Sequence, residues 1–158
     1  MKAAVIGVGN EFRRDDGVGP AVIARLAQLD LPDVALTVSD GEPSQLIDAW
    51  TDTDLTVVVD AVLSGHAQPG RVHRTCLGAL SDGVRAASTH AVGIPEAVRL
   101  ADALGRAPRR LVVYAVEAAD LGFGVGLSPP VAASVEHVVR AVAMELTSSG
   151  SYAAGCAQ

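Results

Sequence analysis

Features of nucleic-acid-binding and membrane proteins are scarce in this chain of 158 residues. Only 12 lysines and arginines oppose 18 aspartates and glutamates, the net charge is −6, and no basic stripe is present that could meet phosphates. No apolar run is long enough to cross a bilayer. We therefore expect neither nucleic acid nor a membrane as a partner.

Aromatic residues and cysteines are also few. Aromatics make up 3% of the chain, so valine, leucine, isoleucine and alanine must fill its core. The two cysteines, Cys76 and Cys156, lie far apart and do not have the spacing of a metal-ligand pair. The sequence enters an apolar segment at Ala3 without the pattern of a secretory signal. We expect a cytoplasmic monomer.

Familiar catalytic motifs are missing as well. The chain has no Gly-x-Ser-x-Gly elbow and no His-Glu-x-x-His pair, which excludes the two hydrolase classes that use them. Gly7 and Gly9 follow an apolar run, as in a dinucleotide-binding loop, and Asp40 ends the next predicted strand like a ribose-binding acid. However, Phe12 occupies the place of the third glycine, and the loop is several residues too long.

The hydrophobic pattern predicts one α/β domain over residues 1–147 and a flexible tail over 148–158. Apolar and alternating runs predict strands, and apolar residues at helical spacing predict helices between them. The expected strands cover 2–7, 34–39, 55–59, 71–75 and 111–116, and the expected helices cover 17–29, 43–50, 94–104 and 131–146. Because strands and helices alternate, the sheet should be mostly parallel with helices on both sides. No helix precedes the strand at 71–75, so that strand is the candidate for an antiparallel neighbour.

The chain is organised around the glycine-rich stretch 7–19, which links the first strand to the first helix. Asp15 and Asp16 fall at the start of that helix, where a carboxylate can cap free amides. Capping accounts for one of the two aspartates but not for both. In an open α/β sheet, such a loop lies at the carboxyl edge, where ligands usually bind.

Three residues are candidates for a site at that edge: Asp16 on the first loop, Asp60 after the third strand, and His90 before the third helix. Two carboxylates and one imidazole can bind a borderline divalent ion and leave positions open. Each residue also has a simpler interpretation. Asp16 would be a helix cap, Asp60 a turn residue, and His90 a surface histidine. A carboxylate directly after an apolar run is costly to bury without a partner, which favours a functional role for Asp60.

Several segments together resemble the hydrogenase maturation endopeptidases, the processing proteases of [NiFe]-hydrogenase large subunits. The matching segments occur in order along nearly the whole chain, and they are Gly7-Val8-Gly9-Asn10, Asp15-Asp16-Gly17-Val18-Gly19, Val59-Asp60-Ala61, Ser88-Thr89-His90 and Gly126-Leu127-Ser128-Pro129. The resemblance implies a three-layer α/β/α fold with a five-stranded, mostly parallel sheet in which one strand is reversed.

The resemblance also implies a function. Family members remove a C-terminal extension from the large-subunit precursor once nickel has been inserted. Three family residues that bind the metal correspond to Asp16, Asp60 and His90, and the nickel would be supplied by the substrate. Asp40 resembles part of a second family loop, from which Glu42 departs, and Glu117 matches only the first residue of a Glu-Pro pair. Their roles stay open at this stage.

No side-chain nucleophile is evident, so peptide hydrolysis would require an activated water molecule. Nickel would then either polarise the scissile carbonyl or only report that the precursor is loaded. Two alternatives remain, namely another metal-assisted hydrolase on the same fold and a non-enzymatic binding protein of hydrogenase maturation.

Overall fold

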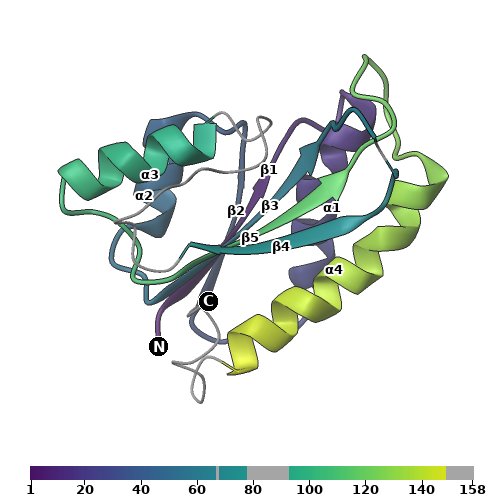
Figure 1. Cartoon of the computed structure of the whole chain (residues 1–158). Coiled ribbons are helices and arrows are strands. Elements are labelled where there is room, and N and C mark those ends of the chain that lie inside the picture. Colours follow the sequence, from purple (N-terminus) through teal and green to yellow (C-terminus); the bar gives the residue numbers. More distant parts are fainter. Residues whose placement is uncertain (67, 78–92, 149–158) are drawn as a thin grey trace.

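The computed structural model of the chain describes residues 1–66, 68–77 and 93–148, in which strands and helices alternate (Figure 1). The elements are β1 (Ala3–Val8), the short 3-10 helix η1 (Arg14–Gly17), α1 (Val18–Leu26), β2 (Val34–Ser39), α2 (Pro43–Trp50), β3 (Leu55–Val62), β4 (Val72–Leu77), α3 (Gly93–Ala103), β5 (Leu111–Glu117) and α4 (Pro129–Ser148).

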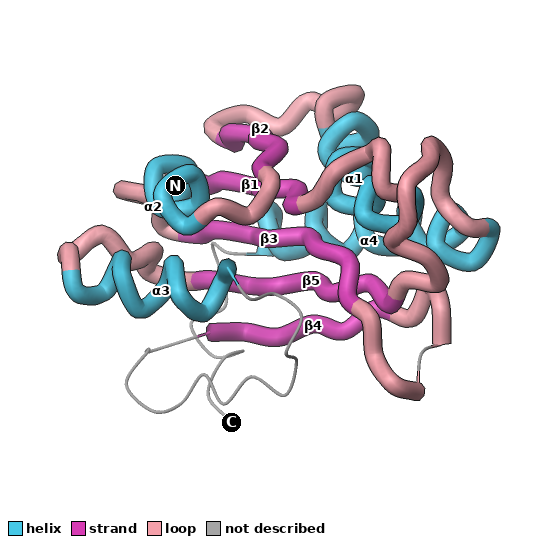
Figure 2. The backbone as a smooth tube through the Cα atoms, turned by 90° about the horizontal axis from the view of Figure 1, so that it is seen from above, coloured by secondary structure: helices cyan, strands magenta, loops and turns pink. Residues whose placement is uncertain are grey.

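The described strands form one sheet in the order β2-β1-β3-β5-β4 (Figure 2). β1 runs parallel to β2 and β3, and β3 runs parallel to β5. β4 pairs antiparallel with β5, as its short connection to β3 predicts. The chain moves outward from β1 to β2 and then returns across β1 to β3, so the winding reverses between β1 and β3. A crevice forms at such a point, and ligands of open α/β sheets bind there.

Helices cover both faces of the sheet, so the fold has the three expected layers. α1 and α4 lie on one face, and α2 and α3 lie on the other (Figure 1). Neighbouring strand residues enter opposite cores, because Val5 and Val57 pack with α1 and α4, whereas Ile6 and Val58 pack with α2 and α3. Every residue of β1 and β3 is buried, which explains why their sequences are nearly continuous apolar runs.

Several boundaries differ from the sequence prediction, and those near the site and at the C-terminal end matter most. β3 continues past Val59 to Val62 because its pairing with β5 continues, so Asp60 lies within the strand instead of after it. The first predicted helix, 17–29, corresponds to α1, which ends at Leu26 instead of residue 29, and the short η1 precedes it. α4 extends to Ser148, and residues 149–158 of the predicted tail lie outside the described part of the chain. No described helix is long and apolar enough to cross a membrane.

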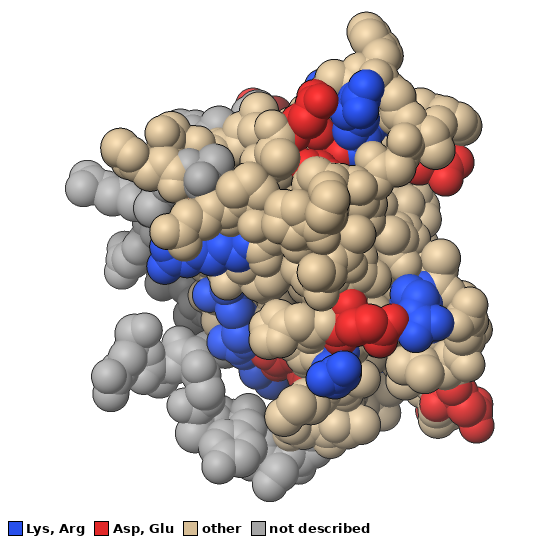
Figure 3. Space-filling view, turned by 90° about the vertical axis from the view of Figure 1, so that its right-hand side faces the viewer, with Lys and Arg blue, Asp and Glu red and all other residues tan. Residues whose placement is uncertain are grey.

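Two groups of charged residues fix α4 to the rest of the domain. Arg25 of α1 lies 2.6 Å from the Glu136 carboxylate, and both side chains are about half exposed. The mostly buried Glu145 pairs with Arg74 of β4 and, at 3.4 Å, with Arg110 beside β5. On the face in Figure 3, acidic and basic side chains occur in small groups between larger areas of other residues. The second group is the more buried of the two, so removal of one of its partners should cost more stability than breaking the exposed pair.

Candidate active site

A pocket of about 280 Å³ opens at the carboxyl end of the sheet, where β1 and β3 separate. Its walls come from the ends of β1 and β3, from the segments that follow β1, β2, β3 and β5, and from the start of α3. The lining residues are Val8, Gly9, Arg13, Asp16, Asp40, Gly41, Asp60, Ala61, Leu63, Gly93, Ile94 and Leu121. Two of the three candidates from the sequence, Asp16 and Asp60, are therefore brought together at the predicted edge.

Glycines allow the first loop to approach the sheet closely. Gly9 has a φ of 138°, and a Cβ atom added to it would lie 1.9 Å from the carbonyl oxygen of Asp16. A Cβ atom on Gly19 would lie 2.5 Å from the carbonyl oxygen of Val8 and 2.8 Å from that of Val59. Because no side chain fits at these positions, the glycines let the Asp16 segment pack directly on the ends of β1 and β3.

Asp16 and Asp60 each have one carboxylate oxygen held by a backbone amide. Asp60 is 6% exposed, and its Oδ1 accepts a 2.8 Å bond from the amide of Ala61. Oδ2 of Asp16 accepts a 2.8 Å bond from the amide of Asn10. Within the described residues, no Lys, Arg or His forms an ion pair with either carboxylate. One oxygen of each is thus left for a ligand.

The surroundings of Asp60 make its ionised form less favourable than in water. Burial is the main cause that raises the pKa of Asp60 to about 7; the hydrogen bond from the amide of Ala61 opposes this shift, and the negative charge of Asp16 contributes to it. A cation bound between the two carboxylates would compensate both the burial and the repulsion. The electrostatics of the pocket therefore fit a positively charged ligand.

Asp15 has a structural role that separates it from Asp16. It is fully buried, and it does not cap its own helix. Its Oδ2 accepts bonds from the amides of Ala119 and Asp120, at 2.8 and 3.2 Å, and from the hydroxyl of Ser128 at 2.8 Å. Its Oδ1 accepts a 2.6 Å bond from the amide of Ser128. Asp15 thereby fastens the loop after β5 to the loop after β1.

Hydrogen bonding also holds the Asp15 carboxylate in its ionised form. Burial raises its pKa, but the amides and the hydroxyl outweigh burial, so the pKa lies below its ordinary value. Ser128 belongs to the Gly126–Pro129 segment of the family motif, and the structure shows that this segment supports the first loop.

Asp40 and Glu42, the two acidic residues between β2 and α2, have different roles. Asp40 lines the pocket, and its Oδ1 accepts a 3.0 Å bond from the amide of Glu42. Glu42 instead caps α2, because its carboxylate accepts a bond from the amide of Gln45. The sequence does contain a feature that could have identified Asp40 as a pocket residue, because Asp40 directly follows β2, the strand beside β1, at the same edge of the sheet.

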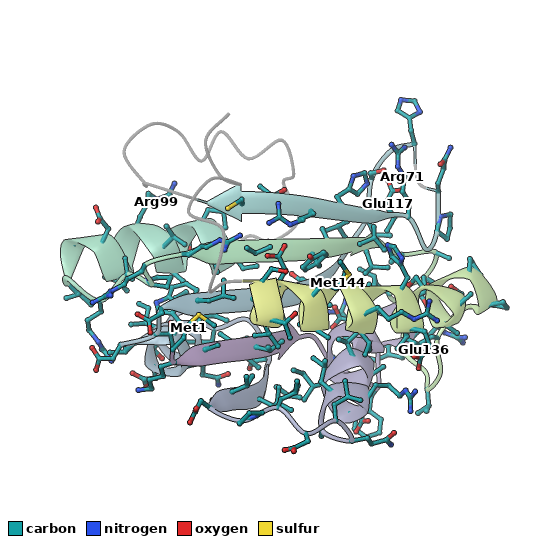
Figure 4. The ribbon with its side chains drawn as sticks, turned by 90° about the horizontal axis from the view of Figure 1, so that it is seen from below. Met1, Arg71, Arg99, Glu117, Glu136 and Met144 are labelled. Carbon is teal, nitrogen blue, oxygen red and sulfur yellow. The ribbon has the colours of Figure 1, made fainter. Side chains whose placement is uncertain are left out.

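Glu117 organises the connection between β3 and β4. This buried carboxylate accepts a 2.9 Å bond from the Ser64 hydroxyl and a 3.3 Å bond from the amide of Gln68. The hydrogen bond from Ser64 is the main cause that lowers the pKa of Glu117, and the charges of His73 and Arg71 lower it further. Figure 4 shows Glu117 and Arg71 close together at one end of the sheet. Glu117 is absent from the lining of the described pocket, so its contacts indicate a supporting role.

His90, the third candidate, lies outside the described residues. Among residues 1–66, 68–77 and 93–148, no group of three His, Cys, Asp or Glu side chains is arranged to hold a metal ion. Arg13, which no sequence pattern singles out, also lines the pocket. No spacing rule identifies it, because a residue in an irregular loop has no periodicity that fixes its direction.

Comparisons with known proteins agree on one family. The family model of the HycI hydrogenase maturation proteases matches residues 20–145. The chain is 28% identical over 158 residues to the Hydrogenase 2 maturation protease of Escherichia coli, with 95% of this chain and 93% of the relative covered. It is 32% identical over 133 residues to the hydrogenase expression/formation protein HupD of Bradyrhizobium diazoefficiens, with 80% and 68% covered.

Solved structures show the same relationship. The hydrogenase maturating endopeptidase HybD from E. coli superposes with a TM-score of 0.78 at 25% identity, with 95% of this chain and 94% of that chain covered. HybD from Thermococcus kodakarensis, a [NiFe] hydrogenase maturation protease, gives a TM-score of 0.72 at 25% identity, with 92% and 99% covered. The chain therefore belongs to the hydrogenase maturation protease family, and it is an endopeptidase of hydrogenase maturation.

Proposed function

We propose that the chain removes the C-terminal extension of a [NiFe]-hydrogenase large-subunit precursor after nickel insertion. In this proposal Asp16, Asp60 and His90 recognise nickel that the precursor already holds. The protein acts as a cytoplasmic monomer, and it has no nucleic-acid or membrane partner. The observation that carries the proposal is the meeting of Asp16 and Asp60 in one pocket at the point where the strand order reverses.

The chemistry of the two carboxylates supports a divalent cation. Both lack an ion-pair partner among the described residues, and burial together with their mutual repulsion opposes the ionised form of Asp60. Metal binding requires ionised carboxylates, and a bound cation supplies the compensating charge. Carboxylate oxygens and an imidazole are suitable ligands for a borderline ion such as Ni²⁺.

The chain path is compatible with His90 as the third ligand. Gly93 and Ile94 line the pocket, and His90 precedes Gly93 by three residues. Three residues of extended chain span at most about 11 Å, so the length of chain before Gly93 allows a ligand at position 90.

The site is expected to hold nickel weakly without the precursor. It offers three ligands, of which two are hard oxygens, whereas closed thiolate or imidazole sites retain such ions far better. Thiolates of the precursor would supply the stronger ligands, so the protein would recognise nickel as a part of its substrate. The pocket carboxylates and Arg13 would then act on the peptide bond that the loaded precursor presents.

The direct test incubates the protein with a nickel-loaded precursor and with a metal-free precursor, and mass spectrometry detects the shortened product. We expect cleavage of the loaded precursor only. Cleavage of the metal-free precursor at an undiminished rate would contradict nickel recognition and would favour a hydrolase that carries its own ion. No cleavage of either form, with stable binding of the loaded one, would contradict processing of this precursor.

A further inference from the structure

Arg13 is the one basic residue among those that line the described pocket. Its neighbour Arg14 is used elsewhere, because its Nε lies 3.3 Å from Oδ2 of Asp120 and donates to the carbonyl oxygen of Phe123. Within the described part of the chain, the Arg13 guanidinium makes no such ion pair, and it is exposed. Its hydrogen-bond donors are therefore available to a ligand in the pocket.

The backbone around Arg13 is fixed although its side chain is exposed. The amide of Arg14 donates a 2.9 Å bond to the carbonyl oxygen of Gly124, and the amide of Gly124 donates a 3.0 Å bond to that of Phe12. The carbonyl oxygen of Arg13 also accepts a 3.1 Å bond from the amide of Asp16. These bonds hold the Cα atom of Arg13 at the pocket wall, so only the side-chain torsions must be ordered when a ligand binds.

Peptide hydrolysis creates a negative charge that the other charged lining residues do not stabilise. The attack of water on a carbonyl carbon places this charge on the carbonyl oxygen, and catalysis depends on donors that face that oxygen. Apart from Arg13, the charged residues of the described lining are Asp16, Asp40 and Asp60, which all repel an anion. Among the charged residues of the described lining, Arg13 is therefore the one that can donate to the oxyanion.

We propose that the Arg13 guanidinium donates hydrogen bonds to the carbonyl oxygen of the scissile peptide bond and stabilises the oxyanion. This inference rests on the proposed function. The water oxygen adds to the carbonyl carbon, the π electron pair moves to the carbonyl oxygen beside Arg13, and a pocket carboxylate accepts the water proton. The C=O bond then forms again, the C–N bond breaks, and the proton passes to the leaving nitrogen.

The test compares Arg13→Gln and Arg13→Lys with a matched control, Arg140→Gln, which changes an exposed arginine on α4. Single-turnover cleavage of the nickel-loaded precursor gives the chemical rate, and a pull-down titration gives precursor affinity. We expect Arg13→Gln to slow cleavage by roughly 100- to 1,000-fold, the usual effect of losing one oxyanion donor, with affinity unchanged. Arg13→Lys should be intermediate because it keeps the charge without the planar fork.

Chemical rescue separates a catalytic role from a structural one. Guanidinium added at low concentration should restore part of the activity of Arg13→Ala and should not change the activity of Arg140→Gln. An undiminished rate for Arg13→Gln, or a loss that lies wholly in precursor affinity, would overturn the inference. If the wild-type chain itself does not process the loaded precursor, the proposed function fails first, so the two failures can be distinguished.

Discussion

Replacing Asp15 by asparagine should loosen the contact between the loops after β1 and β5. The carboxylate is fully buried, and it accepts hydrogen bonds from three backbone amides and one hydroxyl. Asparagine has nearly the same shape, but one of its two terminal groups is a donor. Whichever way the amide is turned, its NH₂ group faces at least one backbone N–H that then lacks an acceptor.

The size of the effect follows from these contacts. If the amide oxygen takes the place of Oδ2, it still accepts the hydrogen bonds from the amides of Ala119 and Asp120, and the Ser128 hydroxyl can adjust by rotation. The amide of Ser128, which donated to Oδ1, then loses its acceptor. An unsatisfied buried amide costs about 1–3 kcal/mol, and each remaining bond loses about 1 kcal/mol when the acceptor is no longer charged. We expect the free energy of unfolding to fall by about 3–5 kcal/mol, a large part of the stability of a typical domain.

Urea unfolding followed by circular dichroism measures this loss. The matched control is Asp120→Asn in the same loop, whose exposed ion pair with Arg14 should contribute less than about 1 kcal/mol. Because folding lowers the pKa of Asp15 from 3.8, its contribution is complete well above pH 4 and is lost as the pH falls below that value. The wild-type and Asp15→Asn proteins should therefore converge in acid. A loss below 1 kcal/mol at pH 7 would refute this account.

Other changes give distinct outcomes. Asp60→Asn should abolish processing in the precursor assay, whereas its urea midpoint should not fall, because a buried carboxylate with a raised pKa costs stability at pH 7. Gly9→Ala should lower both activity and melting temperature, since the added Cβ would meet the carbonyl oxygen of Asp16; wild-type behaviour would contradict the close packing. Glu145→Gln should cost about 2–4 kcal/mol in urea unfolding because the mostly buried Glu145 carboxylate would no longer offset the charges of Arg74 and the more buried Arg110, and Glu136→Gln, in the exposed pair, should cost less than about 1 kcal/mol. Equal losses would show that burial does not govern these pairs. Serine- and cysteine-protease inhibitors should leave cleavage unchanged, and inhibition would reveal a side-chain nucleophile.

The sequence predicted the sheet well because each strand is a distinct apolar run bounded by turn residues. The alternation of strands and helices indicated parallel pairing, and the missing helix before β4 indicated the reversed strand. The end of β3 was missed since its extension depends on β5, a partner far along the chain. A strand boundary set by such pairing is not visible in local composition.

Prediction of the site was limited by the directions of side chains in the first loop. The sequence indicated that one of the two adjacent aspartates has a role beyond capping, and the structure places Asp16 in the pocket and Asp15 in the protein interior. The adjacent arginines divide in the same way, with Arg13 at the pocket and Arg14 paired with Asp120. An irregular loop has no repeating geometry, so only its tertiary hydrogen bonds decide which neighbour faces the ligand. The proposed role of His90 remains a prediction.

The glycines behind the first loop also constrain how the enzyme can diversify. Evolution commonly enlarges a binding pocket by replacing a large side chain with a smaller one. At Gly9 and Gly19 nothing is left to remove, and any larger residue would displace the backbone of Asp16 or Val8. Adaptation to a different precursor can more readily occur among exposed residues such as Phe12 and Leu63, which leave that wall unchanged. Changes at the margin of the pocket can thus alter what it accepts while the wall behind the first loop stays the same.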